Sequence, residues 1–354
     1  MQCHKLGIAS FIECGVRSSL IPILVSYLQE RKMTVRYRKE ESSEKSLPGG
    51  GAQGTLLGPI EYWTQSNKNA DCISQDQKFK YVDDLTTIEI ISLVTKVMSY
   101  NFKQHVASDV GIHSQFIPKE NTETQSVVNE INDWTNNQKM KLNDSKTKYM
   151  IVNFTNIYQF NTRIMLNDKI LDCIEQIKLL GVEFRDDLSW KDNTHAITRK
   201  AFARMTLLRK LVCFGIPKSD LVNLYIIFIR SLLEYCCEVW HSSITEEEVQ
   251  DLERVQKSAV RVIMGDQYEN YEDSLNELDI EELAIRREQM CLNFAKKCVS
   301  NPKTSAWFPM NLLTEHDIRN SNEYQVQYAL TERLKKSTIP YLQRLLNSEE
   351  ENQI

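Results

Sequence analysis

Hydrophobic and polar positions change their spacing near Asp192, and this change divides the chain into two parts. Before it, short runs of apolar and β-branched residues alternate with polar loops, which is typical of short strands joined by turns. After it, apolar residues recur every three or four positions, which predicts helices over 195–213, 218–240, 245–264 and 280–299. The pattern therefore predicts a mixed first part and a helical second part, with Pro217 and Gly265 as breaks between helices.

The first part also contains two predicted helices. One covers 16–28, where cap-forming residues precede the apolar positions and Pro22 lies in the first turn. The other covers 122–140 and is amphipathic, with its apolar residues on one side. Strands are predicted over 33–37, 149–154 and 177–184. The fold class expected from these elements is α+β.

A pair of carboxylates, Asp83 and Asp84, lies between two β-prone stretches where the chain must reverse. Adjacent side chains in a strand point to opposite faces, but at a tight turn both carboxylates can project the same way. Mg²⁺ takes few protein oxygens and fills its shell with water and phosphate, so such a turn suits it. A second pair, Asp186 and Asp187, has a plain hydrophilic setting. The hairpin pattern around the first pair is what makes it specific.

The composition confines any contact with nucleic acid to local patches. The chain has 354 residues, 42% of them hydrophobic, and a formal net charge of −5, so it is not a general polyanion binder. Two acid-free basic clusters stand out. The first is Arg31, Lys32, Arg36, Arg38 and Lys39, and the second is Arg199, Lys200, Arg204, Arg209 and Lys210. Either cluster, taken alone, is a solvated face in its simplest interpretation.

Cysteine usage and hydropathy indicate an intracellular protein, in the nucleus or the cytoplasm. The nine cysteines have no framework spacing and no signal peptide is evident, so reduced thiols are expected. Cys236, Cys237 and His241 approach a metal-binding pattern, but they lack a second ligand pair and core packing explains them better. The longest apolar run, 20–28, is too short to cross a bilayer, so no membrane role is expected.

Several motifs, spread over most of the chain, resemble those of the reverse transcriptase of non-LTR (LINE-type) retrotransposons and follow one another in the same order. The matching segments are the Gln-Gly loop at 49–59 with Gln53 and Gly54, the metal-binding signature Tyr81-Val82-Asp83-Asp84, the Asn-x-x-Lys-Thr segment at 142–148, the primer-contacting hairpin at Leu180-Gly181-Val182, and the thumb helices containing Leu233-Glu234-Tyr235 and 254–257. Each motif is weak alone. Four of them in the family's order and spacing make coincidence a poor explanation.

The resemblance implies a domain organisation. Residues 1–190 are expected to form a partial polymerase palm, a small antiparallel sheet with flanking helices. Residues 191–270 are expected to form a helical thumb, and 271–354 a C-terminal helical region whose acidic tail, 348–353, frays.

The resemblance also implies RNA-directed DNA polymerase activity with two Mg²⁺ or Mn²⁺ ions. Asp83 would be the primary metal ligand and Asp84 its weaker partner, while Gln53, Gly54 and Tyr81 would contact the nucleotide and template. Lys146 would face the triphosphate or protonate the departing pyrophosphate, although an ordinary surface lysine explains it equally well. The partners would be an RNA template, an RNA–DNA duplex held by the 199–210 cluster, and deoxynucleotide triphosphates; the sequence indicates no protein partner.

Three departures from the family pattern argue against activity. The family's third metal-binding aspartate precedes the segment matching 15–20, yet no aspartate occurs before Asp71. Ala52 replaces a proline, and 61–75 is polar where an apolar palm helix is expected. We therefore expect a chain truncated at its N-terminus, without fingers, and with little or no autonomous activity. The alternatives are a non-catalytic nucleic-acid-binding remnant and a helical interaction module.

Overall fold

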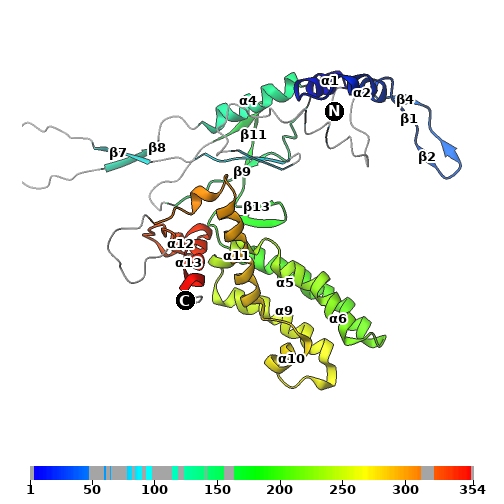
Figure 1. Cartoon of the computed structure of the whole chain (residues 1–354). Helices are drawn as coiled ribbons and strands as arrows, with labels where there is room; N and C mark the ends of the chain where they lie inside the picture. Colours follow the sequence, from blue (N-terminus) through cyan, green and yellow to red (C-terminus); the bar gives the residue numbers. More distant parts are fainter. Residues whose placement is uncertain are drawn as a thin grey trace, which may run out of the picture. The chain divides into compact units, whose positions relative to one another are not determined.

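The computed structural model of the chain divides into two compact units, 1–174 and 175–354 (Figure 1). It describes residues 4–47, 60, 64, 78–81, 84–89, 93–97, 114–118, 123–138, 140, 142–154, 163–311 and 323–351. Helices and small strand pairs are both present, in agreement with the expected α+β class. Whether these units correspond to a palm and a thumb stays a prediction.

The first unit consists of short helices and short strands. Its helices are α1 (His4–Glu13), η1 (Ser18–Leu20), α2 (Ile21–Leu28) and α4 (Thr124–Asn137). Its strands are β1 (Lys32–Met33), β2 (Arg36–Tyr37), β3 (Glu40–Glu41), β4 (Lys45–Ser46), β5 (Lys78–Tyr81), β6 (Asp84–Thr87), β7 (Leu93–Val97), β8 (Ser114–Pro118), β9 (Lys148–Tyr149), β10 (Met165–Leu166), β11 (Lys169–Ile170) and β12 (Asp172–Cys173). The two predicted helices are confirmed, the first of them as η1 followed by α2.

The strands form isolated pairs rather than one sheet. Each described strand pairs with a single partner. An antiparallel sheet was expected, but β9 and β12 pair in parallel. The predicted strands 33–37 and 149–154 are reduced to two-residue pieces because the chain turns or runs irregularly within them. The carboxylate hairpin is confirmed, since β5 and β6 pair antiparallel with Tyr81 opposite Asp84.

Helix α4 is fastened to the segment that follows β6. Glu89 accepts hydrogen bonds from the backbone N–H groups of Glu123 and Thr124 at 2.8 and 2.9 Å. A carboxylate at this position satisfies orphan donors and opposes the positive end of the helix dipole. Leu85 of β6 packs against the buried Ile131 of α4. The carboxylate hairpin and α4 are thus linked by both a cap and an apolar contact.

The second unit begins with a hairpin and is otherwise helical. Its elements are β13 (Gln176–Leu179), β14 (Val182–Arg185), α5 (Lys191–Cys213), α6 (Lys218–Leu224), η3 (Tyr225–Arg230), α7 (Ser231–Glu234), α8 (Cys237–Trp240), η4 (His241–Ser243), α9 (Glu246–Met264), η5 (Gly265–Gln267), α10 (Tyr271–Leu278), α11 (Leu283–Ser300), η6 (Ser305–Trp307), α12 (Glu332–Lys335) and α13 (Thr338–Glu351). Residues 177–184 form two strands rather than one, and the hairpin expected at Leu180-Gly181-Val182 is confirmed, because Leu180 and Gly181 both have positive φ and reverse the chain.

The single helix expected over 218–240 is wrong. The segment passes from α6 into a π-helical stretch, η3, and breaks after α7. At the break Cys236 has a left-handed backbone (φ +51°), which ends a right-handed helix. The indole Nε1 of Trp240 donates to the carbonyl of Tyr235 at 3.1 Å and satisfies a backbone group that the break exposes.

Helices α5 and α9 lie side by side and form the centre of the second unit (Figure 1). Ala201, Met205 and Leu208 recur at helical spacing on α5 and are fully buried. Leu252, Val255, Ala259 and Val260 do the same on α9. Their burial removes a large apolar area from water, which is the main term that stabilises this unit.

The N-terminus of α9 has a capping box that also joins it to α5. Thr245 accepts from the N–H of Glu248 at 3.3 Å, and the Glu248 carboxylate accepts from the N–H of Thr245 at 2.7 Å. The same carboxylate accepts from the Thr194 hydroxyl at 3.0 Å. Both helices are thereby held at their N-terminal ends.

The C-terminal helix extends further than expected. α13 continues through Glu351, so the acidic tail is helical to that residue, and Lys296 of α11 pairs with Glu349 at 2.6 Å. Leu342, Leu345 and Leu346 pack α13 on α11 in a separate core cluster. Among the described residues, no helix combines the length and apolar character that a membrane span requires.

Thr245→Ala should lower the free energy of unfolding by about 1 kcal/mol, because it removes the oxygen that caps α9. Urea denaturation monitored by circular dichroism measures this change. Thr206→Ala, at an exposed site in the middle of α5, is the matched control and should change stability by less than about 0.5 kcal/mol. Equal effects of the two substitutions would contradict the capping role.

Candidate nucleic-acid interface

Of the predicted catalytic and nucleotide-binding residues, Tyr81 and Asp84 lie on the β5–β6 hairpin and Lys146 lies in a turn after α4. Asp84 begins β6 and lies opposite Tyr81, so the hairpin brings these two together. Asp83, Gln53 and Gly54 lie outside the described residues.

The donor chemistry of this hairpin suits Mg²⁺ or Mn²⁺, since both ions prefer carboxylate oxygens. The hairpin supplies two carboxylates, and a two-metal site needs more ligands than these. Within the described ranges, no three His, Cys, Asp or Glu side chains gather where they could hold a metal. The described residues therefore do not by themselves make up a two-metal site.

Lys146 lies in a turn that Asn143 organises. The Asn143 carbonyl accepts from the N–H groups of Lys146 and Thr147 at 3.1 and 2.9 Å, and from the Thr147 hydroxyl at 2.9 Å. The side-chain oxygen of Asn143 also accepts from the Ser145 hydroxyl at 2.7 Å and from the N–H of Lys146 at 3.3 Å, and this local side-chain bonding favours Asn at the start of the turn. The turn leaves Lys146 exposed, so its role as a phosphate ligand or as a surface lysine stays open.

The first basic cluster is largely engaged by its own surroundings. Lys32 pairs with Glu44 at 2.8 Å, and β2–β3 pairing places Arg36 opposite Glu41. The guanidinium of Arg38 lies 5.3 Å from the centre of the Tyr37 ring. These contacts favour the interpretation of this cluster as a solvated face.

The second basic cluster lies on the exposed side of α5. All five side chains are exposed. Arg199 and Lys210 project from nearly the same side, since eleven residues make about three helical turns, and they are about 17 Å apart along the axis. Lys200 and Arg204 lie on one flank and Arg209 on the other. The cluster is therefore a broad cationic face and not a single compact patch.

Arg204 differs from the other members because it contacts the protein itself. Its Nη1 donates to the backbone carbonyl of Phe228 in η3. Elsewhere in the described chain, no ion pair involves Arg199, Lys200, Arg209 or Lys210. Arg204 thus links α5 to η3, whereas the other four cations remain available for a ligand.

Lys178 of β13 joins this face, and the sequence did not indicate it. The Lys178 ammonium lies against Lys200 and is the largest cause that lowers the pKa of Lys200 below its ordinary value. Glu183 pairs with Lys178 at 3.5 Å and offsets part of the repulsion. Like charges held this close attract an anion, because a phosphate between them relieves the repulsion.

The β13–β14 hairpin is fastened to the start of α5. Arg185 pairs with Asp192 at 2.8 Å, and the side-chain oxygen of Asn193 accepts from the N–H of Glu183 at 3.2 Å. The rings of Phe184 and Trp190 meet edge to face at 5.3 Å. These contacts hold the strand pair against α5, from its base at Arg185 to the rung where Glu183 pairs with Lys178.

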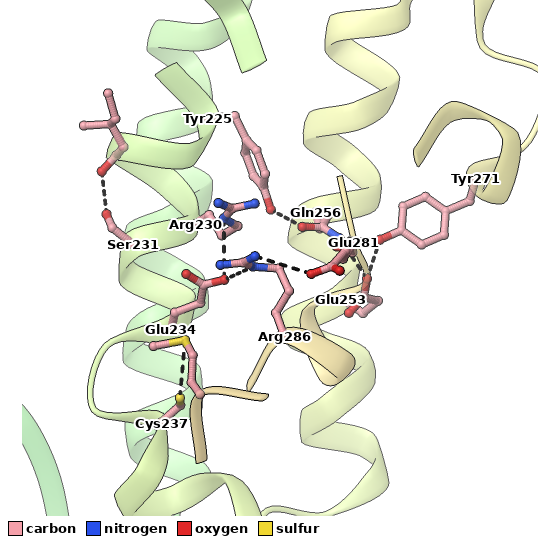
Figure 2. Close-up of polar contacts among 12 residues, drawn as sticks. Tyr225, Arg230, Ser231, Glu234, Cys237, Glu253, Gln256, Tyr271, Glu281 and Arg286 are labelled. Atoms are coloured by element: carbon pink, nitrogen blue, oxygen red, sulfur yellow. Dashed lines mark hydrogen bonds and ion pairs between the residues drawn. The ribbon is translucent and has the colours of Figure 1, made fainter. Parts of the chain in front are cut away.

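A buried polar cluster lies beneath α7, between this helix, α9 and α11 (Figure 2). The Glu234 carboxylate is 13% exposed and accepts from Nε of Arg286 at 2.6 Å, while Nε of Arg230 lies 3.5 Å away. The hydrogen bond to Glu234 raises the pKa of Arg286. At Arg230, the loss of hydration on burial outweighs the attraction of the Glu234 carboxylate, so the pKa of Arg230 is lowered. Glu234 therefore forms a short, hydrogen-bonded ion pair with Arg286 and a longer ion pair with Arg230.

A second part of this cluster joins η3 to α9 and α10. The amide of Gln256 accepts from the Tyr225 hydroxyl and donates to the Tyr271 hydroxyl at 2.9 Å and to the Glu281 carbonyl at 2.9 Å (Figure 2). Tyr271 also donates to Glu253, whose pKa burial raises. Gln256 is fully buried and uses its hydrogen-bonding groups on three elements.

Cys236, Cys237 and His241 take part in packing near this cluster. Cys237 is buried in the core, with Cys236 packed against it. His241 lies beside the buried Arg287, whose Nε is 3.4 Å from the His241 Nδ1. Burial, and after it the Arg287 charge, lowers the pKa of His241 to about 4. The core-packing interpretation is confirmed for the two cysteines.

Glu234→Gln should lower the free energy of unfolding by about 2–3 kcal/mol, because it leaves the partly buried Arg230 without its carboxylate and Arg286 with only the exposed Glu281 at 3.5 Å. Urea denaturation at pH 7 measures the loss. Glu288→Gln removes an exposed carboxylate from α11 and should stay within about 0.5 kcal/mol of the wild type. A Glu234→Gln protein as stable as this control would contradict the role assigned to the ion pair.

Comparison with known proteins gives a distant similarity to a transposon protein. No family model matches the chain. Over 197 residues it is 25% identical to a Drosophila melanogaster protein named "Probable RNA-directed DNA polymerase from transposon BS", which covers 54% of this chain. The chain spans about a fifth (19%) of the length of this curated relative. The similarity supports a relationship to reverse transcriptases.

Proposed function

We propose that this chain derives from a reverse transcriptase of the non-LTR type and that its second unit binds an RNA–DNA duplex through the backbone phosphates. The observation that carries the proposal is the cationic face of α5, continued by Lys178 of the hairpin. A molecule with a net charge of −5 has no general attraction for polyanions. The exposed cations of α5 therefore form a local positive surface, and a polyanion would bind at that surface and not to the molecule as a whole.

The ligand class follows from the chemistry of this face. Exposed Lys and Arg side chains spread over about 17 Å of helix suit a row of phosphates, which are negative and regularly spaced. Arg and Lys contacts to phosphate position a duplex without reading its sequence. A polymerase must hold every sequence equally, so such contacts are what a polymerase-derived protein needs. The distant similarity to an RNA-directed DNA polymerase supports the same ligand.

The catalytic part of the proposal concerns the first unit. Asp83 and Asp84 would hold Mg²⁺ or Mn²⁺, which when bound would stabilise the charge that develops during phosphoryl transfer. Gln53, Gly54 and Tyr81 would contact the nucleotide and the template, and the exposed Lys146 would face phosphate. Two carboxylates do not complete a two-metal site. We therefore propose that these 354 residues, tested alone, do not extend a primer.

Arg199→Gln with Lys210→Gln should weaken binding to an RNA–DNA duplex and reduce the slope of log K against log salt concentration by about 2, since two phosphate contacts are lost. Fluorescence anisotropy with a labelled duplex of mixed sequence, from about 50 to 200 mM salt, measures both quantities.

The matched control removes the same charges elsewhere. Lys303→Gln with Arg333→Gln also replaces one Lys and one Arg at exposed sites of the second unit, and it should leave the slope unchanged. If both double variants alter the slope equally, binding follows net charge and the α5 face is not the binding surface. Absence of duplex binding by the wild-type chain would refute the proposal altogether.

A primer-extension assay tests the catalytic part. With a homopolymer RNA template, a DNA primer and either Mg²⁺ or Mn²⁺, the 354-residue chain should give no product above background, because its metal site lacks ligands. Asp83→Asn is the control that defines the background. Extension by the wild-type chain that this substitution abolishes would contradict the proposed inactivity.

A further inference from the structure

The tip of the β13–β14 hairpin has a contact that the duplex-binding proposal does not use. The hydroxyl of Tyr235, at the end of α7, donates to the carbonyl of Leu180 at 2.8 Å. This residue and its acceptor are 55 positions apart in the sequence. The contact joins the helix break to the hairpin turn within the second unit.

The turn is shaped to receive the Tyr235 ring. Gly181 has a φ of +94°, and a Cβ added there would lie 3.1 Å from Cε1 of Tyr235 and 3.4 Å from its hydroxyl oxygen. A side chain at this position would therefore meet both an unfavourable backbone and the tyrosine ring. Glycine is required because the ring lies directly against the backbone of the turn.

The backbone of Tyr235 is itself held by the buried groups around the helix break. Its backbone carbonyl accepts from Nε1 of Trp240, a fully buried side chain. The guanidinium of Arg287, also fully buried, lies 5.9 Å from the centre of the Trp240 ring. On the other side, the adjacent Glu234 is fixed by Arg286. The tyrosine thus projects from a rigid support toward the hairpin.

The base and the tip of the hairpin are fixed by different elements. The base is attached to α5 through Arg185 and Asp192, and Asn193 holds the N–H of Glu183, the strand partner of Lys178. Val182 is buried in the core of the second unit, and Tyr235 holds the turn itself, at Leu180 and Gly181. A two-stranded hairpin is only marginally stable by itself, so its pairing depends on such contacts. Loss of the turn contact would loosen the Leu179–Val182 rung next to Lys178, and with it the position of Lys178 beside Lys200.

We propose that Tyr235 is a positioning residue that fixes the hairpin tip, so that Lys178 and the α5 cations form one phosphate-binding surface. This inference rests on the proposed function for its ligand, but the clamp itself is a property of the free protein. Tyr235 is 49% exposed, so its hydroxyl can be removed without opening the core.

Hydrogen–deuterium exchange on the free 354-residue chain tests the clamp directly. In Tyr235→Phe, peptides covering 176–185 should exchange about five times faster than in the wild type, because the tip loses one neutral hydrogen bond. Peptides covering 246–264 should not change. Tyr328→Phe, at a site that is 82% exposed, is the matched control and should leave both segments unchanged.

Duplex binding tests the consequence. Tyr235→Phe should weaken the affinity for the RNA–DNA duplex about fivefold while leaving the salt slope unchanged, since no charge is removed. A purely electrostatic defect would lower the slope, and a purely structural role would leave the affinity as it is. Gly181→Ala, which displaces the ring from the opposite side of the contact, should give the same pair of results.

Faster exchange at 176–185 together with weaker binding at an unchanged slope would support the inference. Unchanged exchange in Tyr235→Phe would overturn the clamp, and faster exchange with unchanged affinity would overturn its link to binding. If the wild-type chain does not bind the duplex, the proposed function fails with it, while the exchange data still decide whether Tyr235 fixes the hairpin.

Discussion

The burial of the Glu234 carboxylate against Arg286 and Arg230 is the contact on which the arrangement of the second unit depends. A buried charge is costly unless it is paired, so this carboxylate can occupy its site only when α7, η3 and the start of α11 are all in place. Such ion pairs add little net stability compared with apolar burial. The core along α5 and α9 supplies the stability, and the ion pair selects which arrangement of the helices is compatible with it.

The position of Glu234 has consequences on both sides of the helix break. On one side Tyr235 reaches the hairpin turn, and on the other Arg204 of α5 reaches the carbonyl of Phe228 in η3. The hairpin and α5 therefore both form hydrogen bonds with the broken helix that comprises η3 and α7. The cationic face that we propose as the duplex-binding surface consists of side chains from these two elements, and its geometry depends on the break rather than on the cations themselves.

The sequence predicted those features that depend on neighbouring residues. Helical periodicity identified α4, α5, α9 and α11, and β-prone residues around Asp83 and Asp84 indicated the hairpin whose strands pair as expected. The acid-free basic run at 199–210 indicated the cations of α5 directly. These signals are local, since periodicity and turn composition act over a few residues.

The features that the sequence did not predict depend on distant contacts. The break at Cys236 interrupts a segment whose apolar spacing continues unchanged, and it is stabilised by Trp240 and Arg287. The hairpin at 180–182 was expected, but the placement of Lys178 beside Lys200 on α5 was not, because it depends on how the hairpin packs on that helix. The broad spread of charges around α5, and the use of Arg204 as an internal contact, likewise follow from packing. Chemical footprinting of lysines by acetylation and mass spectrometry, with and without an RNA–DNA duplex, would show whether Lys178 and the α5 cations form one duplex-binding surface. We expect the duplex to protect Lys178, Lys200 and Lys210 together while Lys297 and Lys303 react as before. Protection of none of the three, or equal protection of all lysines, would show that this face does not bind the duplex.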